Sequence, residues 1–403
     1  MLIAWTSYAQ AAPPALGNVR VSDVTPSAFS VIFTTDQRIT PELRIFLDDR
    51  GLASAGSAQV DVMPLPDILQ EPARTAGVWK LRVTGLSPTT TYYYQLRATS
   101  DATGSVSILP QNPPYLSATT ETRIERVQTA DNTRAPTKSP FLLHDSAARG
   151  TPAPAGAVVL ADVEGGAAPV SVYVGDGSRG GVAGVDLSNV FSSQTHESLR
   201  INGGETVRLQ TIAAHDDVRT RAWKLPAVVD GVATTLEPFS QQVTLNPGWN
   251  LVAFQVEPSD RSVETVFAAA APDVTEVWTQ VNGQWVYRDL VANTGTLTTI
   301  NVNQGYFVLA TAPATITVEG GWAVDEIRLL PGWNIVGYRD LDSRLVQDIV
   351  DPMTGSVRAV WGYDEATQTW RCYKPGVPAE VNDLGSIEPG RAYYVYMSTE
   401  RGW

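Results

Sequence analysis

The chain has 403 residues, of which 43% are hydrophobic, so it is long enough for about two to four domains with cores of their own. The sequence has no run of roughly 18 apolar residues, so it predicts no transmembrane helix. The net charge of −13 would repel phosphate backbones and argues against a nucleic-acid partner. The one cysteine, Cys372, excludes an internal disulfide or a cysteine metal cluster, and its strand-like surroundings predict a place in a core.

Residues 1–16 open on a short apolar stub that contains Leu2, Ile3 and Trp5. The sequence Ala9-Gln10-Ala11 follows, and small residues with this spacing resemble a signal-peptidase site. The apolar part is short and no basic residues precede it. Two interpretations stay open: a truncated export signal, or an N-terminal arm that docks on a neighbouring subunit through Leu2, Ile3 and Trp5.

Residues 17–122 alternate between apolar and polar side chains with a period of two, which predicts half-buried strands and a β-sandwich. Within them, Leu86-Ser87-Pro88-Thr89-Thr90-Thr91-Tyr92 resembles the corner motif of fibronectin type III domains. The resemblance implies that the hydroxyl group of Tyr92 bonds back to the chain. Phe33 stands where that family usually has a tryptophan, and it is expected to fill the core.

Residues 123–140 are rich in Thr, Arg, Asn and Pro and are expected to be a linker. Residues 141–242 contain further strand candidates, such as 156–163 and 169–174, separated by glycine turns. Their order resembles the transthyretin-like, carboxypeptidase-regulatory-like modules of bacterial surface proteins. The resemblance implies a second β domain.

Residues 243–403 contain an internal duplication, with copies predicted at 243–322 and 323–403. The first copy opens on Pro247, Gly248, Trp249 and Asn250, and the second opens 84 residues later on Pro331, Gly332, Trp333 and Asn334. Pro-Gly predicts a type II turn with a positive φ at the glycine. Later landmarks also recur: Trp278 with Trp361, Trp285 with Trp370, and Gly305-Tyr306-Phe307-Val308 with Gly390 followed by Tyr393-Tyr394-Val395.

Each copy is predicted to run strand, short helix, β-hairpin, final strand. The helices are indicated by apolar residues at i, i+3 and i+4, beginning at Val263 and at Val346. The pattern resembles the PGWN repeat of bacterial surface and secreted proteins, which implies export and no known chemistry. The predicted fold is therefore mainly β: tandem β-sandwich domains followed by two small β-rich repeats, each with one short helix.

Eight of the 11 tryptophans lie in the duplicated region, and six of them recur at matched positions. Matched recurrence favours packing in the core or between repeats, because each copy must fill the same interior. Indole rings that stack on sugars are the alternative. Trp322 and Trp403 lie outside the matched set, near the end of each copy, and are interpreted as interface candidates.

Catalytic and metal-binding signals are weak. His144, His196 and His215 are scattered and lack metal-ligand spacing, and no G-x-S-x-G elbow is present. Calcium is weighed for Asp162, Glu164, Asp176 and Asp186, which lie in or near predicted turns without a calcium-loop motif. We therefore predict no enzyme activity, no cofactor and no resident metal.

The sequence thus predicts a non-catalytic extracellular structural protein, a surface or filament-forming subunit that assembles through its β domains. Its partners would be further copies of itself or other surface proteins. One alternative is a carbohydrate-binding or adhesive accessory protein whose partner is a polysaccharide. Another is a hydrolase with an unrecognised site.

Overall fold

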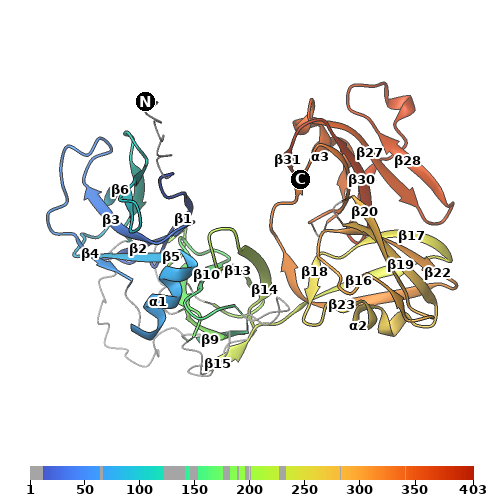
Figure 1. Ribbon diagram of the computed structural model, residues 1–403, viewed down its shortest axis with the longest axis horizontal. Coiled ribbons are helices and arrows are strands. Elements are labelled where there is room, and N and C mark those ends of the chain that lie inside the picture. The colour runs from blue at the N-terminus through green and yellow to red at the C-terminus, as the bar shows by residue number, and fades with distance from the viewer. Residues whose placement is uncertain are drawn as a thin grey trace, which may run out of the picture. The chain divides into compact units, whose positions relative to one another are not determined.

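The computed structural model describes residues 12–63, 67–121, 141–145, 153–175, 182–187, 190–195, 199, 201–226, 233–281, 283–340 and 342–403. The fold is mainly β, with 51% of residues in strands and 9% in helices, as predicted. None of the helices in these ranges is long and apolar enough to cross a membrane. The chain divides into two compact units, which are described separately (Figure 1).

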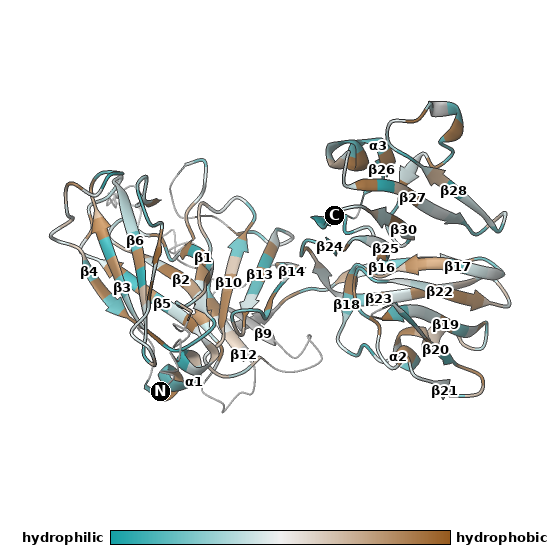
Figure 2. Cartoon of the chain, turned by 45° about the horizontal axis from the view of Figure 1, so that its top comes forward, coloured by the Kyte–Doolittle hydropathy of each residue, from teal (hydrophilic) through white to brown (hydrophobic). Residues whose placement is uncertain are grey.

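The first unit contains a β-sandwich of two antiparallel sheets. One sheet has, in spatial order, β1 (Leu16–Ser22), β2 (Phe29–Thr35), β5 (Val78–Thr84) and β4 (Gln59–Val62). The other has β3 (Ile39–Phe46) and β6 (Thr91–Ser100), with β7 (Val106–Leu109) and β8 (Leu116–Thr119) both paired to β6. Apolar and polar residues both occur on these strands (Figure 2), as expected when one face packs in a core and the other meets solvent.

The sandwich core agrees with the sequence at two landmarks. Phe33 is fully buried and stacks on Trp79 with ring centroids 6.3 Å apart, so it fills the core as expected. The hydroxyl group of Tyr92 accepts a hydrogen bond from the backbone N–H of Ser87 at 2.8 Å, which closes the expected corner. A helix that the sequence analysis did not predict, α1 (Asp67–Ala76), buries Leu69 and Ala73.

Further strands of the first unit pack beside this sandwich. One group is β11 (Val170–Tyr173), β10 (Val158–Val163) and β13 (Thr206–Ile212), and another is β12 (Val182–Asp186), β9 (Phe141–Asp145) and β15 (Ala233–Thr235). The carboxylate of Asp23 accepts hydrogen bonds from the backbone N–H and hydroxyl of Ser171 at 2.7 and 2.6 Å, and lies 2.8 Å from the Lys80 ammonium. Ile32 and Val78 join one apolar cluster with Val158.

The second unit contains both copies of the duplication, and the first copy is built on two sheets. One sheet has, in order, β17 (Gly248–Ala253), β22 (Gly305–Ala310), β19 (Val274–Val281), β20 (Gln284–Asp289) and β21 (Thr294–Gly295). Beside it, β23 (Ala314–Ala323) pairs with β16 (Phe239–Leu245), with β18 (Val256–Pro258) and with Arg221 and Ala222 of β14 (Val218–Lys224). The helix α2 (Val263–Phe267) and the short 3-10 helix Ala268–Ala270 complete it.

The second copy has the corresponding main sheet, in the order β25 (Gly332–Gly337), β30 (Ala392–Met397), β27 (Val357–Asp364) and β28 (Thr369–Tyr373). Its helix is α3 (Val346–Val350), followed by the 3-10 helix Asp351–Met353, and a further 3-10 turn spans Ala379–Val381. Two short pairs, β24 (Arg328–Leu329) with β31 (Arg401–Gly402) and β26 (Arg344–Leu345) with β29 (Ser386–Ile387), form separate two-stranded sheets. Both copies thus run strand, helix, hairpin, final strand, as the sequence predicts.

Each copy also contains a tyrosine corner that the sequence analysis did not single out. The hydroxyl group of Tyr306 accepts a hydrogen bond from the backbone N–H of Asn301 at 2.7 Å. That of Tyr393 accepts one from the backbone N–H of Glu388 at 2.8 Å. The separation of five residues is the same as between Ser87 and Tyr92, so the same device anchors a strand in three places.

The Pro-Gly-Trp-Asn openings are turns held by their asparagines. Gly248 and Gly332 both have φ of +99°, as predicted for glycine in these turns. The Asn250 side chain accepts from the backbone N–H of Asn246 at 2.8 Å and donates back to the carbonyl of Asn246 at 2.8 Å. Asn334 makes the same pair of bonds to Leu330, at 2.9 and 2.7 Å. The asparagine of the motif therefore fastens the turn to its own strand.

This role predicts a graded loss of stability. Asn250 is fully buried whereas Asn334 is half-buried, so water can replace the bonds of Asn334 more readily. We expect Asn250→Ala to lower the free energy of unfolding of the second unit by about 2 kcal/mol, and Asn334→Ala by about half of that. Urea unfolding of the full chain measures both values. Equal losses, or none, would contradict the role assigned to Asn250.

Candidate ligand-binding groove

The two copies in the second unit contact each other through equivalent backbone groups. The backbone N–H of Ala253 donates to the carbonyl of Gly390 at 3.0 Å, and the N–H of Gly337 donates to the carbonyl of Asn303 at 2.8 Å. Each donor ends the strand that follows the Pro-Gly turn, β17 or β25, and each acceptor lies two residues before the strand paired with it, β22 or β30. The copies are therefore related by an approximate local two-fold axis that passes between these bonds.

Small residues allow this close approach. A Cβ atom on Gly337 would lie 2.5 Å from the Cβ of Ala253, and one on Gly305 would lie 2.8 Å from the Cβ of Ala392. Ala253 and Ala392 join Leu251 and Ile335 in one buried apolar cluster across the contact. The strand pairing matches Gly305 with Ala392, so the expected match of Gly305 with Gly390 is wrong by two residues.

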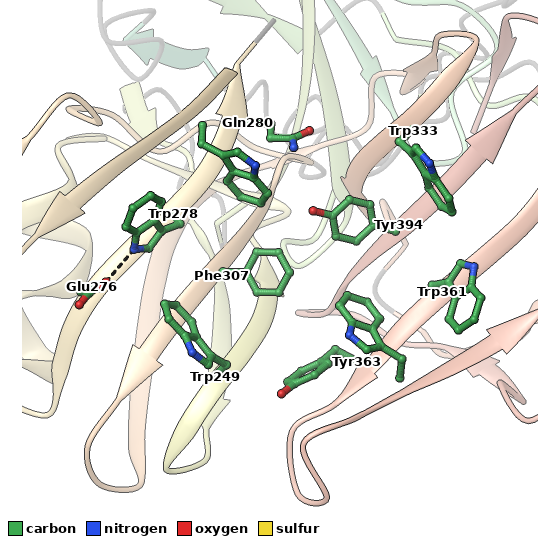
Figure 3. A pocket seen from close by; sticks show the side chains of 11 residues that line it. Trp249, Glu276, Trp278, Gln280, Phe307, Trp333, Trp361, Tyr363 and Tyr394 are labelled. Atoms are coloured by element: carbon green, nitrogen blue, oxygen red, sulfur yellow. Dashed lines mark hydrogen bonds between the residues drawn. The ribbon is translucent and has the colours of Figure 1, made fainter. Parts of the chain in front are cut away.

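Above this contact lies a groove of about 990 Å³ whose walls come from both copies (Figure 3). It is lined almost wholly by aromatic rings. The lining residues are Trp249, Glu276, Trp278, Gln280, Trp285 and Phe307 of the first copy, with Trp333, Trp361, Tyr363, Trp370 and Tyr394 of the second. We call this the aromatic groove.

The local axis explains how the rings are arranged. Phe307 and Tyr394 hold equivalent positions on β22 and β30, and their centroids lie 6.1 Å apart at the centre of the groove. Trp285 lies 6.0 Å from Phe307, and its equivalent Trp370 lies 5.7 Å from Tyr394. Duplication of one strand pattern thus brings ten of the lining residues together as five equivalent pairs, four of them pairs of aromatic rings and the fifth Gln280 with Tyr363.

The polar groups of the aromatic groove are mostly hydrogen-bond donors. The indole N–H of Trp278 is occupied, because it donates to the Glu276 carboxylate at 2.8 Å (Figure 3). The indole N–H groups of the other five lining tryptophans have no acceptor among the described residues. Burial raises the pKa of the Tyr394 phenol to about 12, so it remains a protonated donor in neutral solution.

One end of the aromatic groove is closed by the longer hairpin loop of the second copy. The side-chain amide of Gln368 donates to the carbonyl of Trp249 at 3.0 Å, and its oxygen accepts from the backbone N–H of Trp249 at 3.0 Å. At the equivalent opposite position, no described atom lies within 4 Å of a Cβ built on Gly332. Trp333 is 55% exposed there. The two ends therefore differ although the copies match.

The tryptophans require a correction to the sequence analysis. The six matched tryptophans do not fill a core: Trp285 and Trp370 are 47% and 40% exposed, and the other four are exposed or half-buried. The copies expose them because they sit on the strand faces that point away from each copy's own core. Packing between repeats does occur, since Trp370 lies against Phe307 of the first copy at 6.3 Å.

The remaining predicted residues lie elsewhere. Trp403 is buried in the core of the second copy, and the half-buried Trp322 donates its indole N–H to the carbonyl of Arg339 at 2.8 Å. Cys372 is half-buried on β28, so its predicted place in a core is wrong. Leu2, Ile3 and Trp5 lie outside the described residues. Pro247 and Pro331 precede the turn glycines as expected.

Sequence reasoning did not single out Phe307, Tyr363 and Tyr394 as functional. A signal was present, because side chains alternate on a strand. Tyr306 and Tyr393 are buried and anchor their corners, so Phe307 and Tyr394 must point to the opposite face. The burial of the two corner tyrosines therefore places their neighbours on the same face as the tryptophans.

Among the described residues, the histidines and acidic side chains considered for catalysis or metal binding do not cluster at one place. The Nδ1 atom of His215 lies 3.1 Å from the hydroxyl of Thr34, His144 is on β9, and His196 is outside the described residues. Among the described residues there is no group of three or more His, Cys, Asp or Glu that could hold a metal ion. Of the acidic residues weighed for calcium, Asp162 is on β10, Asp186 ends β12 and Asp176 is not described.

Comparison of the sequence with protein-family models and with curated proteins finds no match. The functional argument is therefore carried by the aromatic groove itself.

The close contact between copies predicts that added bulk there disrupts the groove. We expect Gly337→Val to lower the free energy of unfolding of the second unit by about 2 kcal/mol, because its Cβ would clash with Ala253. Tryptophan emission should shift to longer wavelength, since the rings of the two copies would separate. Thermal melting and fluorescence of the full chain measure both effects.

Gly385→Ala is the matched control, because no described atom lies within 4 Å of a Cβ at this glycine. If Gly337→Val were to melt and fluoresce like the Gly385→Ala variant, the glycine would not be needed for the contact.

Proposed function

We propose that this protein is a non-catalytic binding protein of the cell exterior, which holds an extended polymer in the aromatic groove of its second unit. One observation carries the proposal. Six tryptophans from two copies, three of them exposed and three half-buried, converge on a single groove, and five of their indole N–H groups have no described partner. Apolar rings with unused donors are what a binding site offers and what a core avoids.

The exposure of these rings also argues for an occupant. Soluble proteins rarely leave large contiguous apolar surfaces in water, and such surfaces usually mark a binding site. The sequence favoured a purely structural subunit because its recurring tryptophans were expected to pack in a repeated core. The exposure of these tryptophans removes that support. Assembly into a surface layer or filament stays a prediction.

The lining residues favour binding over catalysis. Acid–base or nucleophilic chemistry needs at least two cooperating groups, such as a nucleophile beside a base. The described lining of the aromatic groove contains one carboxylate, Glu276, and its other members are aromatic apart from Gln280. The exterior location is supported by the resemblances at Tyr92 and at the Pro-Gly-Trp-Asn turns.

The test is an array that displays both polysaccharides and synthetic peptides, probed with the full chain. We expect saturable binding that falls by at least about tenfold in the double variant Trp285→Ala with Trp333→Ala, which removes one exposed ring from each copy. Both side chains are about half exposed, so the variant should keep the parent's melting temperature.

Val291→Ala serves as the control, because this apolar side chain is 72% exposed in the same unit and lies outside the aromatic groove. It should bind like the parent. Absence of any ligand on the array, or undiminished binding by the double tryptophan variant, would refute the proposed function.

A further inference from the structure

The aromatic rings that line the groove do not lie in one plane. Trp249 meets Phe307 at an interplanar angle of 85°, and Trp333 meets Tyr394 at 81°. Trp370 meets Phe307 at 70°. Aromatic faces in one plane would form a flat platform on which consecutive sugar rings stack. Rings at right angles instead form compartments between them, which suit compact, rigid side chains such as proline rings.

The hydrogen-bonding groups of the aromatic groove also favour proline residues over sugar rings. The free donors of the groove are five indole N–H groups without a described acceptor and the Tyr394 phenol, whereas its acceptors are one carboxylate, one side-chain amide and the phenolic oxygens of Tyr363 and Tyr394. A sugar hydroxyl can accept from these donors, but it also donates, so a polysaccharide would bring many O–H groups for which the described lining has few acceptors. A proline residue has a carbonyl but no N–H, and its polyproline II backbone exposes that carbonyl.

The position of the one negative charge in the aromatic groove favours one orientation of a charged ligand. Glu276 is the one carboxylate of the described lining, and its second oxygen is not used by Trp278. The equivalent position in the second copy is the buried Ala359, so the negative charge lies on one side of the local axis only. The whole chain is also acidic. A cation at one end of the ligand would therefore complement the first-copy side of the groove.

One indole ring that lines the aromatic groove already contacts a cation. The ammonium group of Lys374 lies 5.8 Å from the centroid of the Trp361 ring. This is within the range of a cation–π interaction. On the opposite side Glu276 and Trp278 lie together in the lining, and no described lysine or arginine is paired to that carboxylate.

From these observations we infer that the ligand is a proline-rich peptide in the polyproline II conformation, with a lysine or arginine near the end that contacts Glu276. This inference rests on the proposed function and names its ligand class. Recognition would follow the general mode in which a preformed polyproline helix docks in an aromatic groove, with little entropy lost on binding.

Calorimetry on the full chain with synthetic peptides of about ten residues tests the inference. An oligoproline with an N- or C-terminal arginine should bind saturably. A peptide of the same charge with Gly and Ser in place of proline should bind at least about tenfold more weakly, because it must be ordered on binding. Val291→Ala should bind like the parent, and Trp285→Ala with Trp333→Ala should lose binding.

Glu276→Gln keeps an acceptor for the Trp278 indole and removes the charge. In this variant the preference for the arginine peptide over neutral oligoproline should fall by about threefold to tenfold. An unchanged preference would overturn the assignment of Glu276.

Cello-, xylo- and chito-oligosaccharides form the comparison series. If they bind and lose binding in the double tryptophan variant, while oligoproline does not bind, the peptide inference is wrong and the proposed function stands. If neither class binds, both fail.

Discussion

Two backbone hydrogen bonds between the duplicated copies set the architecture of the second unit. Ala253 donates to Gly390, and Gly337 donates to Asn303, so the same end of each copy binds the other. Such reciprocal bonds require the backbones to lie close together, which small residues at 253, 305, 337 and 392 permit. Buried backbone groups must find partners, so this pairing also satisfies the N–H groups of Ala253 and Gly337, which lie buried at the contact.

The aromatic groove is a consequence of this pairing. Each copy carries aromatic rings on the face that its own core does not use, and the local axis brings the two faces together around Phe307 and Tyr394. Duplication alone would give a symmetric groove. The longer loop that carries Gln368, and the carboxylate of Glu276 without a counterpart at Ala359, make the two ends different. The two copies are related by approximate symmetry, but the groove between them has two different ends.

Much of the fold could be predicted from the sequence because local patterns determine it. Alternation of apolar residues indicated the strands, the motif at Tyr92 indicated its corner, and the repeated Pro-Gly indicated turns with positive φ at Gly248 and Gly332. The helix α1 was not anticipated, because its buried Leu69 and Ala73 give only a short apolar pattern over 10 residues that also include Pro72.

The site was harder to predict for a physical reason. Recurrence of a tryptophan shows that both copies need it, but not whether its neighbours are its own core or the other copy. That depends on how the copies pair, which in turn depends on contacts such as that of Gly337 with Ala253, far apart in sequence. A tryptophan that recurs in both copies can fill the core of each copy, and it can equally line the two walls of a groove between the copies.

The most direct test of this account follows the indole N–H resonances of the full, ¹⁵N-labelled chain by NMR as the arginine-terminated oligoproline is added. The account predicts shifts for the five indoles of the groove that have no acceptor among the described residues, because these donors acquire acceptors; they belong to Trp249, Trp285, Trp333, Trp361 and Trp370. The resonances of Trp79, which donates to Thr35, and of the buried Trp403 should stay in place. Unmoved groove resonances, or equal shifts in Trp79 and Trp403, would contradict it.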